Sequence, residues 1–167
     1  MRKFRLLNSA FTVVILIVNV PITSADEECT FSQAGMLQEV RRVASAFPGA
    51  VIDNNLIRAS WEVDGEVVET FSANGCHDYG KQARRITKET ERRDVNDVKA
   101  VALELGRKFM AADDFDTLHQ ALMESIEFVH DSEKSEYMVI DHRFGEILIT
   151  HSFANGVDSV GVSWPEL

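Results

Sequence analysis

Alternating apolar and polar residues beside short glycine turns are the feature that most constrains the fold of this chain. From Ile57 to Val63 every second residue is apolar, which is the pattern of a strand with one buried face. The pairs Asp64-Gly65 and Asn155-Gly156 favour two-residue hairpin turns. The sequence therefore predicts antiparallel β-structure.

Six strands are predicted in two groups of three. The first group covers residues 57–63, 66–73 and 82–90, and the second covers residues 137–142, 146–154 and 157–164. Trp61 and Trp164 occupy inward positions of alternating strands, so we expect both indoles to be buried.

Three segments instead repeat apolar residues at the three- and four-residue spacing of a helix. The first covers residues 32–47 and ends at Pro48-Gly49. Asp94 can cap the second, and Asp113 or Asp114 can cap the third. The third has an inward stripe of Phe115, Leu118, Leu122, Ile126 and Val129. The fold class predicted is α+β, with one or two antiparallel sheets of about six strands covered by three helices.

The two strand groups resemble each other. Gly65–Ser72 can be laid over Gly145–Ser152, and Ala-Asn-Gly follows in both after one inserted residue in the second. This similarity favours a duplicated helix-plus-three-strand unit, although hairpins that converge on the same residue types would explain it equally well. Where the second group turns at Asn155-Gly156, the first has a longer loop, residues 74–81.

Residues 1–25 have the composition of a cleavable secretory signal peptide. A basic start precedes an apolar run over residues 11–20, and small residues follow at 23–25. A membrane anchor is the alternative, but the run stops at Pro21, and a spanning helix needs about 20 apolar residues. We therefore expect an exported periplasmic or secreted protein without a membrane span after cleavage, in which residues 26–167 form a single domain.

Net charge limits the kinds of partner that the chain can bind, and cysteine content indicates its disulfide bonding. The chain has 27 acidic and 17 basic residues and a net charge of −10, which argues against nucleic-acid binding and favours a cationic partner or simply solubility. The only cysteines are Cys29 and Cys76. Export to an oxidising compartment predicts a disulfide between them, with two thiols or an intermolecular bridge as alternatives. The oligomeric state is not predicted.

The loop of residues 74–81 is the strongest candidate for a binding site. Two glycines allow sharp turns at its ends, and a cysteine, an imidazole, a carboxylate and a phenol lie between them. A bridge to Cys29 would clamp the loop and reduce the entropy lost on binding. In a purely structural interpretation, the bridge fastens the N-terminal segment and the imidazole is solvated. The candidate binding residues are Gly75, His77, Asp78, Tyr79 and Gly80.

The segment of residues 72–82 contains a distinctive set of residues: Ser72, Ala73, His77, Asp78, Gly80 and Gln82. In this set it resembles the loop of the periplasmic inhibitors of vertebrate-type lysozyme. This resemblance implies that His77 enters the cleft of a target enzyme and meets its catalytic carboxylates, with Asp78 as its neighbour. The chain departs from the family pattern where Cys76 is displaced and Tyr79 replaces a second cysteine, and the resemblance does not extend beyond this segment.

Catalysis is the less favoured interpretation. The histidines available for acid–base chemistry near neutral pH are His77, His119, His130, His142 and His151. None lies in a recognised hydrolase, metalloprotease or phosphate-binding motif. His142 and His151 could meet across the Phe144-Gly145 hairpin near Asp141, and His119 and His130 could share a helix face, but both pairs also suit ordinary structural positions. No catalytic residue, metal ligand or cofactor is predicted.

Basic residues cluster in one predicted strand and the segment after it. They are Lys81, Arg84, Arg85, Lys88, Arg92 and Arg93. As one strand face they could bind an anionic ligand such as a lipid head group or a cell-wall polymer. A charged edge that discourages aggregation is the simpler explanation.

These observations favour a protein that acts by binding. The leading hypothesis is an inhibitor or immunity-type protein that occludes a periplasmic or extracellular enzyme through the loop. A small-ligand-binding or cell-envelope accessory domain is the alternative, and an unrecognised hydrolase is the third hypothesis.

Overall fold

A computed structural model describes most of the chain after residue 30. The described ranges are 31–75, 80–124, 129–130, 136–142 and 145–165, and for residues 129–130, 136–142 and 145 only the backbone is described. The predicted signal peptide, the Cys29–Cys76 bridge and the loop residues His77, Asp78 and Tyr79 lie outside these ranges.

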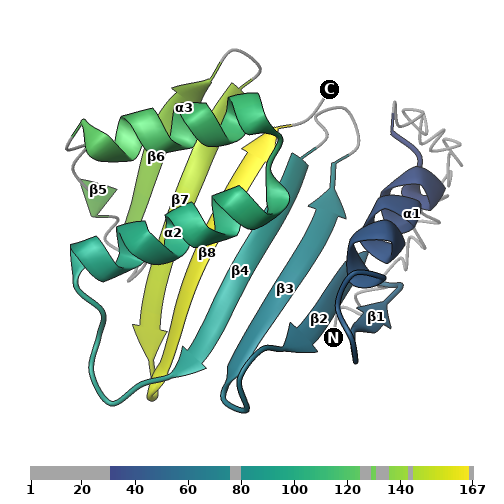
Figure 1. Cartoon of the computed structure of the whole chain (residues 1–167), viewed down its shortest axis with the longest axis horizontal. Coiled ribbons are helices and arrows are strands. Elements are labelled where there is room, and N and C mark those ends of the chain that lie inside the picture. Colours follow the sequence, from purple (N-terminus) through teal and green to yellow (C-terminus); the bar gives the residue numbers. More distant parts are fainter. Residues whose placement is uncertain (1–30, 76–79, 125–128, 131–135, 143–144, 166–167) are drawn as a thin grey trace, which may run out of the picture.

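Helices and strands follow one another in an α+β arrangement, as predicted (Figure 1). The helices are α1 (Gln33–Ala44), α2 (Val95–Phe109) and α3 (Ala112–Met123). The strands are β1 (Val51–Asp53), β2 (Arg58–Glu62), β3 (Val67–Asn74), β4 (Gly80–Lys88), β5 (Val129–His130), β6 (Glu136–His142), β7 (Gly145–Ala154) and β8 (Val157–Pro165).

The described strands form one eight-stranded antiparallel sheet in the order β1-β2-β3-β4-β8-β7-β6-β5. The six predicted strands are all present. The two additional strands, β1 and β5, are short and lie at the edges of the sheet, where a few residues complete the ladder without an alternating pattern long enough to detect.

The helix ends follow from local chemistry. The Ser32 hydroxyl accepts a hydrogen bond from the Gly35 amide and caps α1, and the Asp94 carboxylate caps α2 as predicted. The prediction for α3 was wrong at both ends. Ala111 occupies its N-cap without a side-chain bond, and the helix stops at Met123 because Val129 pairs with the edge of the sheet in β5 rather than continuing the helical stripe.

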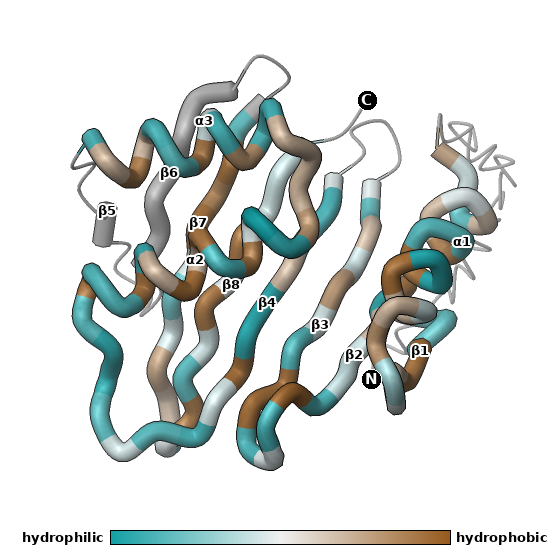
Figure 2. Tube along the Cα trace, in the orientation of Figure 1, coloured by the Kyte–Doolittle hydropathy of each residue, from teal (hydrophilic) through white to brown (hydrophobic). Residues whose placement is uncertain are grey.

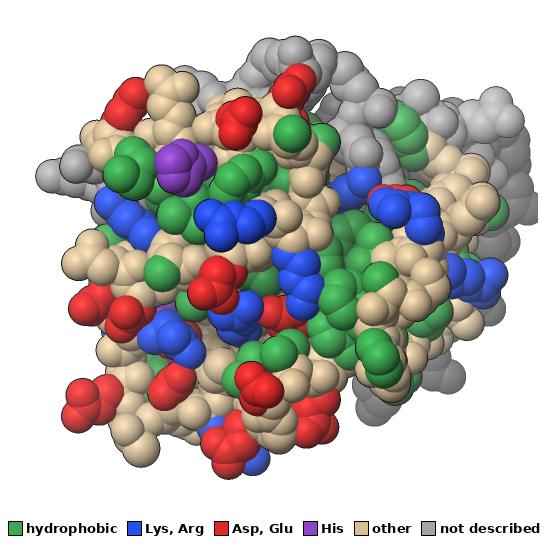
Figure 3. All heavy atoms as spheres, in the orientation of Figure 1, with side chains coloured by type: hydrophobic (Ala, Val, Ile, Leu, Met, Phe, Trp, Pro, Cys, Tyr) green, Lys and Arg blue, Asp and Glu red, His purple; other side chains and the backbone are tan. Residues whose placement is uncertain are grey.

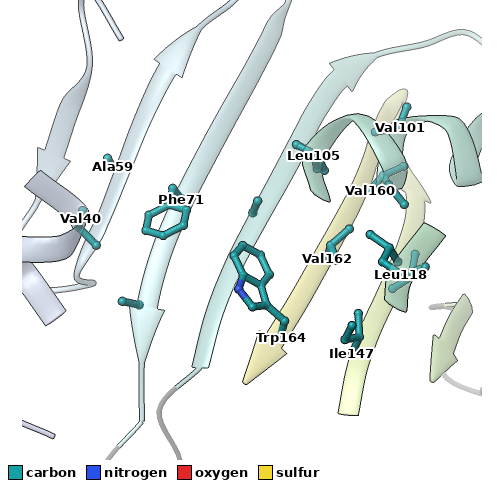
Figure 4. Packing of buried hydrophobic residues seen from close by; sticks show 14 of the residues in the cluster. Val40, Ala59, Phe71, Val101, Leu105, Leu118, Ile147, Val160, Val162 and Trp164 are labelled. Atoms are coloured by element: carbon teal, nitrogen blue, oxygen red, sulfur yellow. The ribbon is translucent and has the colours of Figure 1, made fainter. Parts of the chain in front are cut away.

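The core lies between the sheet and the helices, which cover one face of it (Figures 1 and 2). Strand residues alternate, so that apolar side chains enter this layer from one face (Figure 4). Trp61 and Trp164 are 4% and 3% exposed, which confirms the predicted inward face.

The β3–β4 hairpin is tighter than predicted. Its ladder continues to the pair Asn74↔Gly80, so only residues 75–79 connect the strands, instead of the predicted loop of residues 74–81. Backbone pairing continues beyond the alternating pattern because even polar residues at the end of a hairpin can join the ladder.

The two halves of the sheet have matching registers, in agreement with the similarity noticed in the sequence. When Gly65–Ser72 is laid over Gly145–Ser152, each residue pair between β3 and β4 corresponds to a residue pair between β7 and β8. Glu69↔Arg85 becomes Ile149↔Val162, Phe71↔Ala83 becomes His151↔Val160, and Asn74↔Gly80 becomes Ala154↔Val157.

The same match defines a pseudo-twofold axis at the centre of the sheet. It makes Ala83 equivalent to Val160 and Arg85 equivalent to Val162, so Arg84 is equivalent to Gly161. Arg84 and Gly161 also pair directly across β4 and β8. The axis therefore passes through this pair.

Candidate functional site

The β3–β4 connection occupies the place of the tight turn in the other half. Gly75, at its start, has a φ of 120°, which disfavours residues with a Cβ. Gly80 lies in β4, where a Cβ would stand 3.5 Å from the Trp164 carbonyl oxygen, an ordinary contact. The structure thus supports a conformational role for Gly75 but not for Gly80.

Lys81 lies at the base of this connection and faces the helices. Its side chain is 9% exposed, and its ammonium donates a hydrogen bond to Glu39 Oε1 at 3.0 Å. Glu39 also accepts two hydrogen bonds from the Arg42 guanidinium, at 2.6 and 2.7 Å. Bonds from Arg42, and secondarily from Lys81, lower the pKa of Glu39 to about 2. The α1 helix is thereby fastened to the hairpin by charge.

A groove of about 410 Å³ opens between α1 and the end of α2. Figure 3 shows apolar side chains gathered between these helices with basic side chains beside them. The lining residues are Arg42, Val43, Ala46, Phe47, Lys81, Lys108, Phe109, Met110 and Ala111. The described residues of the lining are apolar or basic and none is acidic, in a chain whose net charge is −10.

An aromatic cluster supports the groove. Phe47 stacks on Trp61 with ring centroids 4.2 Å apart and planes 4° from parallel. Phe109 meets both rings at an angle, with centroids 5.9 Å and 5.8 Å away. The Lys108 ammonium lies 4.4 Å from the Phe47 ring centroid, within range of a cation–π interaction. Rings contributed by three separate segments therefore fix the groove wall.

Lys108 also reaches a buried carboxylate on β3. Glu69 is 0% exposed and accepts hydrogen bonds from Lys108 and, at 2.8 and 3.1 Å, from Arg85. Burial opposes ionisation of Glu69, but the bonds from Lys108 and Arg85 outweigh it, so the pKa of Glu69 lies below its usual value. Glu69 is an ionised anchor for the α2 helix beside the groove.

A second buried polar network lies in the other half of the sheet. His151 Nε2 and Asp158 Oδ1 are 2.8 Å apart, and each side chain is 1% exposed. Arg93 donates to the other Asp158 oxygen at 2.9 Å and also bonds Thr87 and Glu89. Both partners of this histidine–carboxylate pair lie within the core, so substrate would have no access to it from solvent.

Neither histidine pairing from the sequence is formed. His142 pairs with Gly145 at one end of the β6–β7 hairpin, whereas His151 pairs with Glu136 at the other. His119 is exposed on α3, but His130 belongs to β5, so the two do not share a helix.

The basic segment does not form one face either. A strand points successive side chains to opposite sides. Lys81 and Arg85 face the helices, where both pair with carboxylates, while Arg84 and Lys88 face away. Arg93 lies beyond the strand, in the Asp158 network.

Sequence reasoning missed the groove and both buried networks, because each brings together residues from distant segments. In the described part of the chain, His, Cys, Asp and Glu residues form no cluster suited to a metal ion. None of the described helices is both long and apolar enough to span a membrane. Comparisons with protein-family models, curated proteins and solved structures find no match to this chain.

Proposed function

We propose that this protein is an exported binding protein. It would use the connection between β3 and β4 to occlude a periplasmic or extracellular enzyme. His77, Asp78 and Tyr79, the residues singled out in the sequence, would form the centre of the contact. The role is that of an inhibitor or immunity-type protein.

One observation carries the proposal. The two halves of the sheet match pair by pair up to Asn74↔Gly80 and Ala154↔Val157, and their hairpins then diverge. The second half closes with Asn155-Gly156, whereas the first has residues 75–79, which include an imidazole, a carboxylate and a phenol. Two residues are enough to connect the strands of such a hairpin. The longer connection between β3 and β4 therefore adds no stability, and its extra residues are available for recognition.

The base of the hairpin would give such a contact a firm foundation. Lys81 is buried and bonded to Glu39 of α1, and Gln82 bonds Ser163 of β8 at 3.0 Å. Flanking positions that are held in place reduce the ordering cost of binding, which favours affinity.

The groove favours a second candidate function, the binding of a small ligand. Its apolar wall and basic lining suit a molecule with an apolar body and an acidic group. The described side chains do not favour a histidine-based hydrolase, since His151 is bonded within the core and His119 is exposed on α3.

The decisive experiment transplants one hairpin onto the other half. Residues 75–79 are replaced by Asn-Gly, the turn of the second half, and a Cys29→Ser/Cys76→Ser variant serves as the matched control for loss of Cys76. A partner captured from envelope extract by the wild-type protein is identified by mass spectrometry, purified and titrated against each variant. We expect the transplant to fold and to lose the partner, and the cysteine control to bind more weakly but measurably.

A His77→Ala/Tyr79→Ala variant tests the side chains themselves. Exposed loop residues contribute little to stability, so the thermal midpoint should stay nearly unchanged. Affinity should fall by about 2 kcal/mol or more, roughly thirtyfold, as is usual for central anchors of an interface. Full affinity in both loop variants, together with loss of binding in Ala46→Lys at the groove, would reject the loop in favour of the groove.

A further inference from the structure

The face of the sheet that the described helices leave uncovered has a charged group at its centre. Arg84 pairs with Thr70 on one side and with Gly161 on the other, and Gly161 pairs with Thr150. All four positions alternate with the buried core residues of their strands, so they belong to the face of the sheet that is turned away from the helices. Because Thr70 and Thr150 are equivalent in the two halves, the Arg84–Gly161 pair on the pseudo-twofold axis lies between two matching threonine positions.

Gly161 makes room for this arginine. A Cβ at Gly161 would lie 2.8 Å from the Thr150 hydroxyl oxygen, 3.3 Å from Arg84 Nε and 3.6 Å from Arg84 Nη2. The guanidinium therefore lies across the glycine, toward Thr150, instead of extending into solvent. The absence of a side chain at Gly161 is what allows this position.

Arg84 is half-buried, yet its charge is not balanced by an acid. Among the described residues, the Arg84 guanidinium forms no ion pair with a carboxylate. Burial, and secondarily the positive charge of Arg58, lowers the pKa of Arg84 below its ordinary value. An arginine in such a place stays charged, so its partial desolvation is a cost that an anion would offset.

The acidic positions nearest to the two arginines on this face do not supply that anion. Glu62, at the other end of β2 from Arg58, shares the face but forms no ion pair with Arg84 or Arg58 among the described residues. Asp53 pairs with Arg58 across β1 and β2, but its carboxylate accepts hydrogen bonds from the Asn55 and Leu56 amides at 3.0 and 3.2 Å. Arg58 and Arg84 thus present two positive charges on one face, with Ser72 and Thr70 as their neighbours on the strand between them.

We propose that this face carries a binding site for a tetrahedral oxyanion, a phosphate or sulfate group, centred on Arg84 and assisted by Arg58. The planar fork of a guanidinium matches two oxygens of such a group, and the hydroxyl of Thr150, toward which the guanidinium lies, can donate to another. The site is on the opposite side of the sheet from the groove and does not depend on the function proposed for the hairpin.

Titration of the purified protein with inorganic phosphate, and separately with sulfate, tests the site by calorimetry at low ionic strength. Chloride at matched ionic strength is the control ion. We expect saturable binding of one phosphate or sulfate per chain, weakened about tenfold or more in Arg84→Gln and about threefold in Arg58→Gln. Lys88→Gln removes an equal charge from the same strand and face and should change the affinity less than about twofold.

Vesicles identify the source of the anion. Binding to phosphatidylcholine vesicles that contain phosphatidylglycerol, lost in Arg84→Gln and retained in Lys88→Gln, assigns the site to a lipid head group. Phosphate binding without vesicle binding assigns it to a soluble molecule.

Three outcomes overturn the proposal. One is that neither phosphate nor sulfate binds, and another is that Arg84→Gln binds as tightly as the wild-type protein. The third is a concentration-dependent dimer that Arg84→Gln abolishes, in the absence of oxyanion binding, which would mean that a second copy covers this face.

Discussion

The two halves of the sheet share a register but bury their polar residues at different places. Glu69 in β3 is equivalent to Ile149 in β7, and Phe71 in β3 is equivalent to His151 in β7. All four side chains are buried. Strands β3 and β7 thus each accept a buried polar side chain at a position where the other strand has an apolar one.

The partners of these polar groups explain how the exchange is tolerated. Glu69 bonds Lys108 of α2 as well as Arg85 of the neighbouring strand. Asp158, which holds His151, also bonds Arg93 from the segment before α2. A buried polar side chain is stable only when a partner reaches it. The segments around α2, rather than the sheet, therefore decide which position can be polar.

Helix number is the second difference between the halves. In the described ranges the first half has α1 alone, whereas the second has both α2 and α3. The groove lies where α1 and the end of α2 approach without a further helix between them. Near-symmetry of the strands thus coexists with an asymmetric helical layer, and the asymmetry creates the concave surface.

The largest expected effect comes from breaking the polar network of the second half. Asp158→Ala removes the shared partner of His151 and Arg93 and leaves both without their bond to a side chain that is 1% exposed. Removing one member of a buried pair costs roughly 3–5 kcal/mol, which urea denaturation would measure.

The control for this variant is a carboxylate at the surface of the other network. Glu104 bonds Arg85, but its side chain is 60% exposed, so Glu104→Gln should cost less than about 1 kcal/mol. Equal losses in the two variants would mean that burial does not distinguish these ion pairs.

A smaller effect is expected from converting the first half into the second. Glu69→Ile copies Ile149, but it leaves Arg85 and Lys108 without their buried carboxylate, at a cost of about 3 kcal/mol. Adding Arg85→Val copies the whole pair Ile149↔Val162. Because apolar residues often replace a buried ion pair without loss, the double variant should regain at least half of the stability in the same denaturation assay.

Failure of this rescue would change the comparison. A double variant no more stable than Glu69→Ile would show that the first half depends on the Glu69–Lys108 contact to hold α2. The two halves would then share backbone geometry, but equivalent positions would not tolerate the same side chains at equal stability.

The sequence was sufficient for the elements that local patterns specify. Alternation located β2, β3, β7 and β8, and Asp94 marked the start of α2. Local patterns could not distinguish a helix from an edge strand near Val129. The apolar spacing there is compatible with both structures, and only the pairing with β6 decides between them.

The candidate sites were less predictable. The basic segment was noticed, but its split between two faces becomes informative only with the β4–β8 pairing, which places Gly161 beside Arg84. The groove depends on Phe47, Lys81 and Lys108 from three segments. No periodicity in one stretch of sequence reports contacts of that range.

The smallest expected effect concerns the ion pair at the base of the hairpin, where the halves carry opposite charges. Lys81 in β4 is equivalent to Asp158 in β8, and it bonds Glu39. The pKa of Glu39 is lowered from 4.5 to about 2 in the folded protein. A carboxylate with a depressed folded-state pKa stabilises the fold above its unfolded pKa, and this contribution is lost as the pH falls through the folded-state value.

Glu39→Gln should therefore cost about 1 kcal/mol near neutral pH, less than the pKa shift alone would give, because the Arg42 side chain is 70% exposed and solvent screens it. Urea denaturation between pH 7 and pH 2 measures the difference in unfolding free energy between wild-type protein and variant. That difference should be constant above about pH 5 and shrink as the pH falls from 4.5 toward 2. A difference independent of pH would attribute the cost of Glu39→Gln to packing, so that the charge of Lys81 would no longer distinguish this half from the half that carries Asp158.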